Sequence, residues 1–155
     1  MALSTRTKIL LATLLVFTLF FSQKGTNKNV GADFDVNINA RTQTTNNALS
    51  VVNGVPGVTQ FTMTVTIQNT GNYLLTCDID SLSPPPFDVA LTKLTKNIHV
   101  GETASWTTDF IQAAQFESYT QPVDFVVDAT CTFIIDGTTY NVGPKSDTLP
   151  ITVTA

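Results

Sequence analysis

Residues 123–135, VDFVVDATCTFII, carry an apolar side chain at every second position over the whole stretch. Period-two alternation of this length predicts a β-strand with one face in a hydrophobic core. Asp136-Gly137 follows, and this dipeptide favours the tight turn of a β-hairpin because both residues tolerate positive φ. Residues 138–142 are therefore predicted to return antiparallel to the first strand. The side chains expected in the core are those of Val123, Phe125, Val127, Ala129, Cys131, Phe133 and Ile135.

The same pattern recurs along the rest of the chain. Residues 61–69 alternate again, and the polar stretch 69–72 then predicts a turn. No stretch keeps the spacing of a long helix, and only residues 111–119 have helical-turn character. Seven to nine short strands predict an all-β fold, an antiparallel β-sandwich of jelly-roll or immunoglobulin-like type. Further strands are expected at 49–52, 73–79, 103–110 and 149–154, with one or two more within 89–100.

The composition supports a single globular β domain. Of the 155 residues, 13% are charged and 43% are hydrophobic. Intrinsic disorder requires low hydrophobicity and high charge, so this composition excludes it. Threonine occurs 27 times, and its β-branched side chain favours strands over the helices of a bundle or coiled coil.

The charges divide the chain into a basic leader and an acidic body. Residues 1–32 carry four bases and no acid, whereas residues 33–155 carry twelve acids and four bases, a net charge of −8. The apolar run at 9–21 would form a helix about 20 Å long, too short for a ~30 Å hydrocarbon core. We expect this leader helix to be a signal peptide cleaved after Ala32; an uncleaved anchor or a pilin-type helix is the alternative.

Export follows from each of these interpretations of the leader. The domain at 33–155 is then secreted or displayed at the cell surface, and it meets the membrane only through residues 1–32. Cys77 and Cys131 fit this location, because a disulfide persists in an oxidising compartment. The loop they would close is about 54 residues long, which gives roughly 4 kcal/mol in the chain-entropy model. Both lie on apolar strand faces, as a disulfide between two sheets requires; two buried free thiols are the alternative.

Reactive groups that would indicate an enzyme are scarce. His99 is the single histidine, and no nucleophile motif lies beside it. Carboxylates pair along predicted strands at Asp33/Asp35, Asp78/Asp80 and Asp124/Asp128, where solvated strand faces explain them without a glycosidase cleft. No metal-ligand spacing or cofactor motif is present, although calcium bound between strands stays open. We therefore expect no enzyme activity and no cofactor, and a net charge of −8 disfavours nucleic acid as a partner.

The first strand of the body is the most informative segment for function. Residues 33–40, DFDVNINA, place Phe34, Val36, Ile38 and Ala40 on one face, and the polar spacer at 41–47 follows. Such a strand pairs within its own domain or fills a groove in a neighbouring subunit by strand addition. Repeated head-to-tail, the second mode gives a non-closing contact and hence a filament. The residues alone leave both modes open.

A resemblance to a known family favours strand addition. The run at 55–61 (VPGVTQF), the alternating strand to Ile67 and the QNTGN turn at 68–72 resemble the TasA-like secreted fibre proteins and the related archaeal bundling pilins. The resemblance covers about forty residues. It implies a jelly-roll-like β-sandwich whose subunits donate an N-terminal strand to a neighbour, with Phe34, Val36 and Ile38 as donor side chains.

The leading hypothesis is a structural subunit that polymerises with itself into an extracellular filament through N-terminal strand donation. The alternative is a membrane-anchored or pilin-type immunoglobulin-like module that binds a cell-envelope or surface protein. A secreted hydrolase is a third, weaker hypothesis. The N-terminus of the mature protein separates the first two, because Asp33 favours the donor strand and a retained Met1 favours the anchor.

Overall fold

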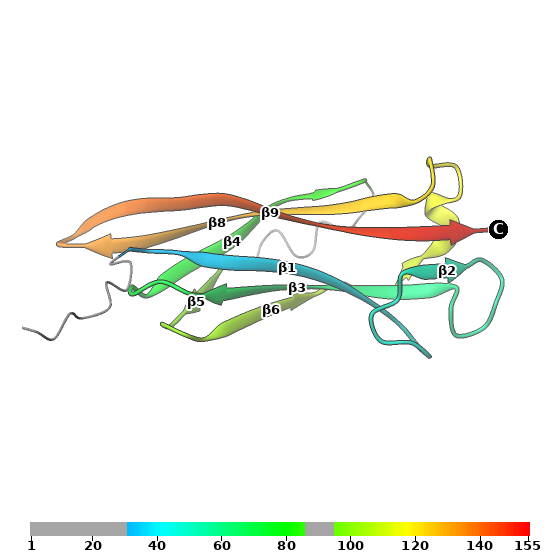
Figure 1. Ribbon diagram of the computed structural model, residues 1–155, viewed down its shortest axis with the longest axis horizontal. Helices are drawn as coiled ribbons and strands as arrows, with labels where there is room; N and C mark the ends of the chain where they lie inside the picture. The colour runs from blue at the N-terminus through cyan, green and yellow to red at the C-terminus, as the bar shows by residue number, and fades with distance from the viewer. Residues whose placement is uncertain (1–30, 86–94) are drawn as a thin grey trace, which may run out of the picture. The chain divides into compact units, whose positions relative to one another are not determined.

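The computed structural model describes residues 31–85 and 95–155 (Figure 1). Residues 31–155 form one compact unit. The predicted leader helix and signal peptide at 1–32 lie almost wholly outside the described residues, and so does the first half of the predicted strand region 89–100. Within the described residues, no helix is long and apolar enough to span a membrane.

The described chain is built of strands, so the all-β prediction is confirmed. One short 3-10 helix, η2 (Ala113–Phe116), lies where the sequence predicted a helical turn. The strands are β1 (Phe34–Thr42), β2 (Ser50–Val52), β3 (Gln60–Asn69), β4 (Leu75–Ser83), β5 (Lys96–Ile98), β6 (Thr103–Thr107), β7 (Ile111–Gln112), β8 (Val123–Ile135) and β9 (Thr138–Thr154).

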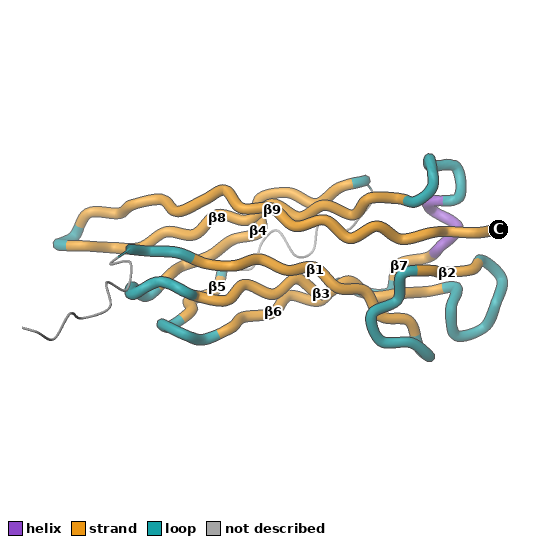
Figure 2. Tube along the Cα trace, viewed as in Figure 1, coloured by secondary structure: helices purple, strands orange, loops and turns teal. Residues whose placement is uncertain are grey.

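These strands form two sheets that face each other across a hydrophobic core (Figures 1 and 2). The first sheet has the order β1-β3-β6, and β7 pairs with the beginning of β3. The second sheet has the order β2-β9-β8-β4-β5. Pairing among the described strands is antiparallel except between β2 and β9, which run parallel.

The core confirms the predicted inward faces of the two longest alternating segments. In β3, the side chains of Phe61, Met63, Val65 and Ile67 are fully buried. In β8, the inward-facing side chains of Phe125, Val127, Ala129 and Cys131 are fully buried, and burial becomes partial at Phe133 and Ile135. Phe61 and Phe125 come from opposite sheets and meet edge to face, with ring centroids 5.6 Å apart.

Strand β9 differs from the prediction of two separate strands, at 138–142 and 149–154. It is continuous over 17 residues, because the Gly143-Pro144 step is accommodated by an irregularity in the pairing with β8. Ala129 pairs with Lys145 and Cys131 with Val142, so β9 carries one extra residue here. A Gly-Pro pair predicts the end of a strand, but the long hairpin partner allows pairing to resume beyond it.

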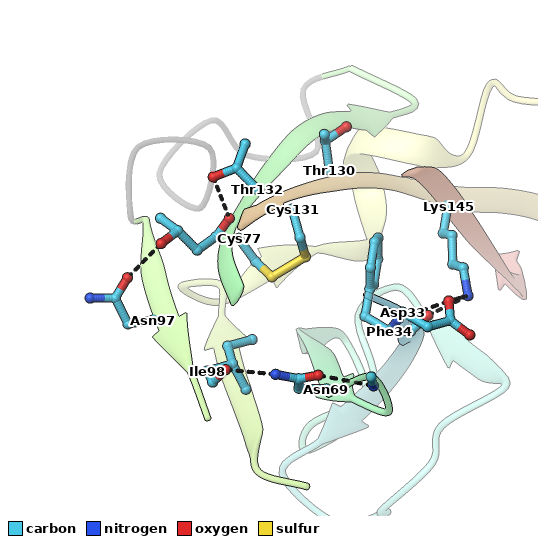
Figure 3. The surroundings of a disulfide bond; sticks show 12 residues. Asp33, Phe34, Asn69, Cys77, Asn97, Ile98, Thr130, Cys131, Thr132 and Lys145 are labelled. Carbon is cyan, nitrogen blue, oxygen red and sulfur yellow. Dashed lines mark hydrogen bonds and ion pairs between the residues drawn. A yellow bond between two sulfur atoms is a disulfide. The ribbon is translucent and has the colours of Figure 1, made fainter. Parts of the chain in front are cut away.

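The predicted disulfide is present, but it does not join the two sheets. Cys77 of β4 and Cys131 of β8 are register partners on neighbouring strands of the second sheet, with Cα atoms 4.0 Å apart (Figure 3). The prediction that the bond links opposite sheets was wrong. Two apolar-facing cysteines satisfy either geometry, and only the strand order decides between them.

The two ends of the two-sheet unit are referred to below by the segments that form them. At the hairpin end lie the Asp136-Gly137 turn and the start of β1, where Phe34 pairs with Asn69 (Figure 1). At the spacer end lie the end of β1, where Thr42 pairs with Phe61, and the end of β9 beside β2.

Candidate functional site

The candidate site is the N-terminal strand β1 together with the groups that bind it. These groups are called the β1 seat below: strand β3, Gly143, Lys145 and Asp147 of β9, and the turn at 69–72. β1 pairs with β3 over its full length, and it is an edge strand of the first sheet. Within the single chain it therefore pairs with its own domain. The strand continues two residues past the predicted boundary at Ala40, to Thr42, because Arg41 and Thr42 also pair with β3.

The four predicted interface residues share one face of β1, as their spacing indicated. Phe34 is 0% exposed, Ile38 and Ala40 are each 2% exposed, and Val36 is partly buried against the same core. Asp35, Asn37 and Asn39 point to solvent between them. β1 thus supplies a complete apolar face to the core, although only one edge of its backbone is paired with another strand.

Phe34 occupies a tight seat formed by β9. Gly143 lies beside the ring: a Cβ on Gly143 would be 3.2 Å from Phe34 Cζ and 3.1 Å from the carbonyl oxygen of Ala129. Gly143 also has φ of +102°, which disfavours any other residue. The ammonium of Lys145 lies 5.3 Å from the centre of the Phe34 ring. The irregular step in β9 therefore creates the space that Phe34 fills.

The turn at Asn69–Asn72 holds the start of β1. The amides of Thr70 and Gly71 donate to the carbonyl oxygen of Asp33, at 3.1 and 2.9 Å. A Cβ on Gly71 would lie 2.5 Å from the nitrogen of Asp33, so only glycine allows this approach. The sequence predicted the turn but not its contact with β1, because the two are far apart in the chain.

The amide of Asn69 shapes this turn from inside the core. Asn69 is 0% exposed, and its Nδ2 donates to the carbonyl oxygens of Tyr73 at 2.7 Å and Ile98 at 2.8 Å. Its Oδ1 accepts from the amide of Gly71 at 3.0 Å (Figure 3). A buried side-chain amide whose donors and acceptor are all satisfied fixes the local backbone. Asn69 therefore also fixes the amides of Thr70 and Gly71, which donate to Asp33.

The outer edge of β1 faces two charged side chains of β9 instead of a strand. Lys145 donates to the carbonyl oxygen of Phe34 and to Asp33 Oδ1, the latter at 2.7 Å (Figure 3). Asp147 Oδ2 accepts from the amide of Ile38 at 2.8 Å. Inward-pointing charges at an edge discourage pairing with other chains. Lys145 and Asp147 share one face of β9 with Leu149 and Ile151, so the period-two spacing places them on its inward face, although it does not name β1 as their neighbour.

The ion pair at the start of β1 changes the titration of Asp33. The hydrogen bond from Lys145 holds the pKa of the Asp33 carboxyl below its ordinary value of 3.8, although partial burial opposes this shift. Attraction to the same ammonium and the hydrogen bond from the Phe34 amide also lower the pKa. Asp35 lies 3.8 Å from the Lys145 ammonium. The acidic pair that the sequence placed on a solvated face therefore serves to anchor β1.

At the opposite edge of the first sheet, a second lysine also donates to a backbone carbonyl oxygen of the edge strand. Lys96 of β5 donates to the carbonyl oxygen of Ser105 in the edge strand β6. Its ammonium also lies 4.7 Å from the centre of the Trp106 ring. The edge strands β1 and β6 thus each have a carbonyl oxygen bound by a lysine of the second sheet, beside an aromatic ring of the same edge strand.

The predicted spacer at 41–47 forms a compact, hydrogen-bonded loop that reverses the chain direction, and it is not an extended linker. Thr42 Oγ1 accepts from the amide of Thr45 at 2.9 Å, and Arg41 forms a bridge with Asn46. The amide of Ala48 then donates to the carbonyl oxygen of Ala40 at 2.8 Å. Polar composition predicted a loop here, but the hydrogen bonds of Thr42 give that loop a defined shape.

The remaining candidate groups are dispersed over the surface. His99 is exposed in the turn before β6, where its amide donates to Glu102 at 3.3 Å. The pKa of Asp128 is lowered from 3.8 by hydrogen bonds from Ser146 and Ser81 across three strands. Among residues 31–85 and 95–155, no group of three or more His, Cys, Asp and Glu side chains is placed to hold a metal ion.

Comparisons with known proteins do not place this chain in a family. No family model and no curated protein matches it. A crystal structure described as the ApaA protein from Bordetella pertussis aligns with 77% of this chain and 94% of that chain, at 16% identity and a TM-score of 0.40. At this TM-score the likeness carries no argument about fold or function.

Proposed function

We propose that this protein is a structural, non-enzymatic subunit of an extracellular filament, and that it polymerises by donating β1 to a neighbouring copy. In this proposal the domain is an exported β-sandwich of jelly-roll or immunoglobulin-like type. Its principal partner is a second copy of the same chain. The strand that would be exchanged is the one bearing Phe34, Val36, Ile38 and Ala40.

The observation that carries the proposal is the way in which β1 is held. Its backbone pairs with β3 on one edge only, whereas side chains of Lys145 and Asp147 hold the other edge. The strand can therefore leave without breaking a second ladder. An identical strand from another copy would make the same contacts in the vacated seat, as domain swapping requires.

The burial free energy that is lost when β1 leaves its domain favours binding of a β1 strand from another copy. Complete burial of a Phe or Ile side chain contributes about 1.5–3 kcal/mol relative to exposure, and Phe34 and Ile38 are both almost fully buried. A domain without β1 would also expose one edge of β3. A copy that has lost its own strand therefore gains several kcal/mol by accepting another.

Deletion of residues 33–40 from the full chain tests the proposal. We expect the exported variant to be a poorly stable monomer that forms no fibres in electron micrographs. A synthetic peptide spanning residues 33–42 should bind the variant and restore its thermal stability. Fibres formed by the deletion variant would overturn the proposal.

Substitutions on the two faces of β1 provide a matched control. Replacing the inward pair, Phe34→Ala with Ile38→Ala, should abolish peptide binding and fibre formation. Replacing the outward pair, Asn37→Ser with Asn39→Ser, should leave both within twofold, because these side chains are exposed. Equal effects of the two pairs would show that burial in the seat does not drive assembly.

A surface at the hairpin end favours the second candidate, an anchored binding module. Leu74, Ile134 and Tyr140 are 47%, 66% and 46% exposed there. Tyr73 and Phe133 line a cavity of about 130 Å³ beside them. N-terminal sequencing of the protein from cells separates the candidates: Asp33 supports strand donation, and a retained Met1 supports the anchored module.

A further inference from the structure

The short connection after β1 limits where a receiving copy can lie; this inference rests on the proposed donation of β1. Thr42 is the last residue of β1, and Leu49 is the next residue whose backbone is bound to its own domain independently of β1, through its carbonyl oxygen to the amide of Thr152 at 3.0 Å. Seven residue steps separate them, so a fully extended connection spans about 25 Å.

This reach is shorter than the two-sheet unit. β8 alone has 13 residues, which corresponds to about 43 Å at ~3.3 Å per residue. Both Thr42 and Leu49 lie at the spacer end, since β1 ends beside the start of β3 and Ser50 pairs with Thr152 near the end of β9. The donated Thr42 lies at the spacer end of the receiver. If the hairpin end of the donor touched that spacer end, the donor's own Leu49 would lie farther from Thr42 than the connection of about 25 Å can reach.

The spacer end also has the surface that a close contact needs. Three apolar side chains are exposed around it: Leu49 at 61%, Val55 at 44% and Phe110 at 57%. Phe110 precedes β7, which pairs with the start of β3. Exposed apolar groups that lie together on a domain mark interaction surfaces.

Two cavities flank the spacer at this end. One, of about 360 Å³, is lined by Phe110, by Arg41 and Thr42 at the end of β1, and by Gln43 of the spacer. The other, of about 240 Å³, is lined by Gln43 together with residues of the 56–60 segment. Such hollows next to exposed apolar side chains can receive side chains of a second molecule.

The charges at the spacer end are complementary to those of another copy. Arg41 and Asp109 are both exposed, and the ion pairs among the described residues all involve Lys145. With β1 exchanged, every spacer end still carries one Arg41 and one Asp109, so the Arg41 at one end can face the Asp109 of the adjacent end without the reciprocal pairing that would close a dimer. Opposite charges on one surface allow self-association in spite of the net negative charge of the body.

We propose that the spacer end is the contact surface between copies: the donor and the receiver of β1 meet at their spacer ends, through Leu49, Val55, Phe110, Arg41 and Asp109. In a filament, each spacer end then meets those of the preceding and following copies. The subunits therefore pack side by side or around an axis near this end, and they do not form a string of units joined from hairpin end to spacer end.

Electron microscopy of fibres from the full chain tests this arrangement directly. We expect an axial rise per subunit shorter than the ~43 Å length of β8. A rise of that length or more would overturn the inference and leave strand donation standing. Fibres from the variant lacking residues 33–40 would overturn strand donation itself, so the two failures are distinguishable.

Matched substitutions at the two ends provide a second test. Leu49→Ser with Phe110→Ser should lower the association constant at least tenfold in sedimentation, as expected for apolar anchors of an interface. Ile134→Ser with Leu74→Ser, which replaces comparably exposed side chains at the hairpin end, should change it less than twofold. Equal effects of the two pairs, or no effect of the first, would overturn the inference.

A charge exchange completes the test. Arg41→Glu should weaken association, and adding Asp109→Lys should restore it, because the pair is then reversed. A closed dimer that loses stability in Leu49→Ser with Phe110→Ser would support the spacer-end contact while contradicting the filament. An Arg41→Glu chain that associates like the parent would contradict the charge pairing.

Discussion

Asp33 shows how single residues fix the start of β1. Its carboxylate accepts from Lys145, while its carbonyl oxygen accepts from the amides of Thr70 and Gly71. The sequence placed Asp33 on the polar face of a strand, whereas in the structure Asp33 immediately precedes β1; the sequence did not predict either partner. Lys145 is 112 residues away along the chain, and no local pattern relates the two.

The lowered pKa of Asp33 predicts that β1 is held less firmly in acid. Above pH 3.8 the carboxylate is charged in the folded and unfolded chains, so its bonds contribute fully. As the pH falls through 3.8 towards the lower folded pKa, the unfolded chain binds the proton first and stability is lost. Thermal unfolding between pH 6 and pH 2 should show this loss.

The Asp33→Asn variant isolates the contribution of this carboxyl. It should be less stable than the parent at pH 6, and its stability should depend less steeply on pH below 4. Part of the dependence should persist, because hydrogen bonds from Ser146 and Ser81 also lower the pKa of Asp128. Identical slopes for the parent and Asp33→Asn would contradict the role given to Asp33.

At the scale of elements, the edges of the first sheet are the notable feature. Only four basic residues lie in 33–155, and two of them, Lys145 and Lys96, bind carbonyl oxygens of β1 and β6. An unpaired strand edge invites pairing with other chains. The domain has few charges, so these two lysines are the groups that occupy edge carbonyl oxygens of β1 and β6 and thereby oppose pairing with another chain.

We predict that Lys145→Met loosens β1. The change removes the ion pair with Asp33 and leaves the carbonyl oxygen of Phe34 without its donor, at a cost of about 1 kcal/mol for a half-exposed site. Urea unfolding should detect this loss, and fibre formation should start sooner because β1 leaves its seat more readily.

Lys96→Met is the matched control, since Lys96 binds the edge strand β6, which takes no part in the proposed exchange. Its stability loss should be similar to that of Lys145→Met, but its fibre formation should keep the parent rate. If the two variants accelerated assembly equally, general instability would explain the effect, and release of β1 would not.

At the scale of the whole molecule, the proposed strand exchange makes the length of the spacer decisive for whether β1 pairs within one chain or between chains. In the single chain it must reverse direction after Thr42, and the bonds from Thr42 to Thr45 and from Ala48 to Ala40 support this return. The same residues would be extended if β1 lay in another copy. A hinge that is too short to turn favours exchange.

Deletion of Thr44–Asn46 should therefore shift the protein towards assembly. The shortened spacer can no longer turn back to place β1 in its own domain. The four residue steps that remain between Thr42 and Leu49 span about 14 Å, which still reaches an adjacent copy. Light scattering after size exclusion should show oligomers at concentrations where the parent is monomeric. Inserting four Gly and Ser residues in the spacer should have the opposite effect, and a monomeric deletion variant would contradict the role of the spacer.

The sequence by itself determined the local and periodic features of this protein. Alternation specified the strands and their inward faces, and it placed Phe34, Val36, Ile38 and Ala40 together, because side-chain direction in a strand depends only on position along it. The dipeptide at 136–137 specified the hairpin, since turn chemistry is local.

The tertiary structure decided everything that depends on which strands are neighbours. It placed Cys77 and Cys131 in one sheet, joined the two halves of β9 and brought Lys145 to the edge of β1. It also gathered Leu49, Phe110 and Arg41 at one end. Strand order sets these contacts, and it results from packing both sheets over one core, a sum of long-range contacts that no local pattern records.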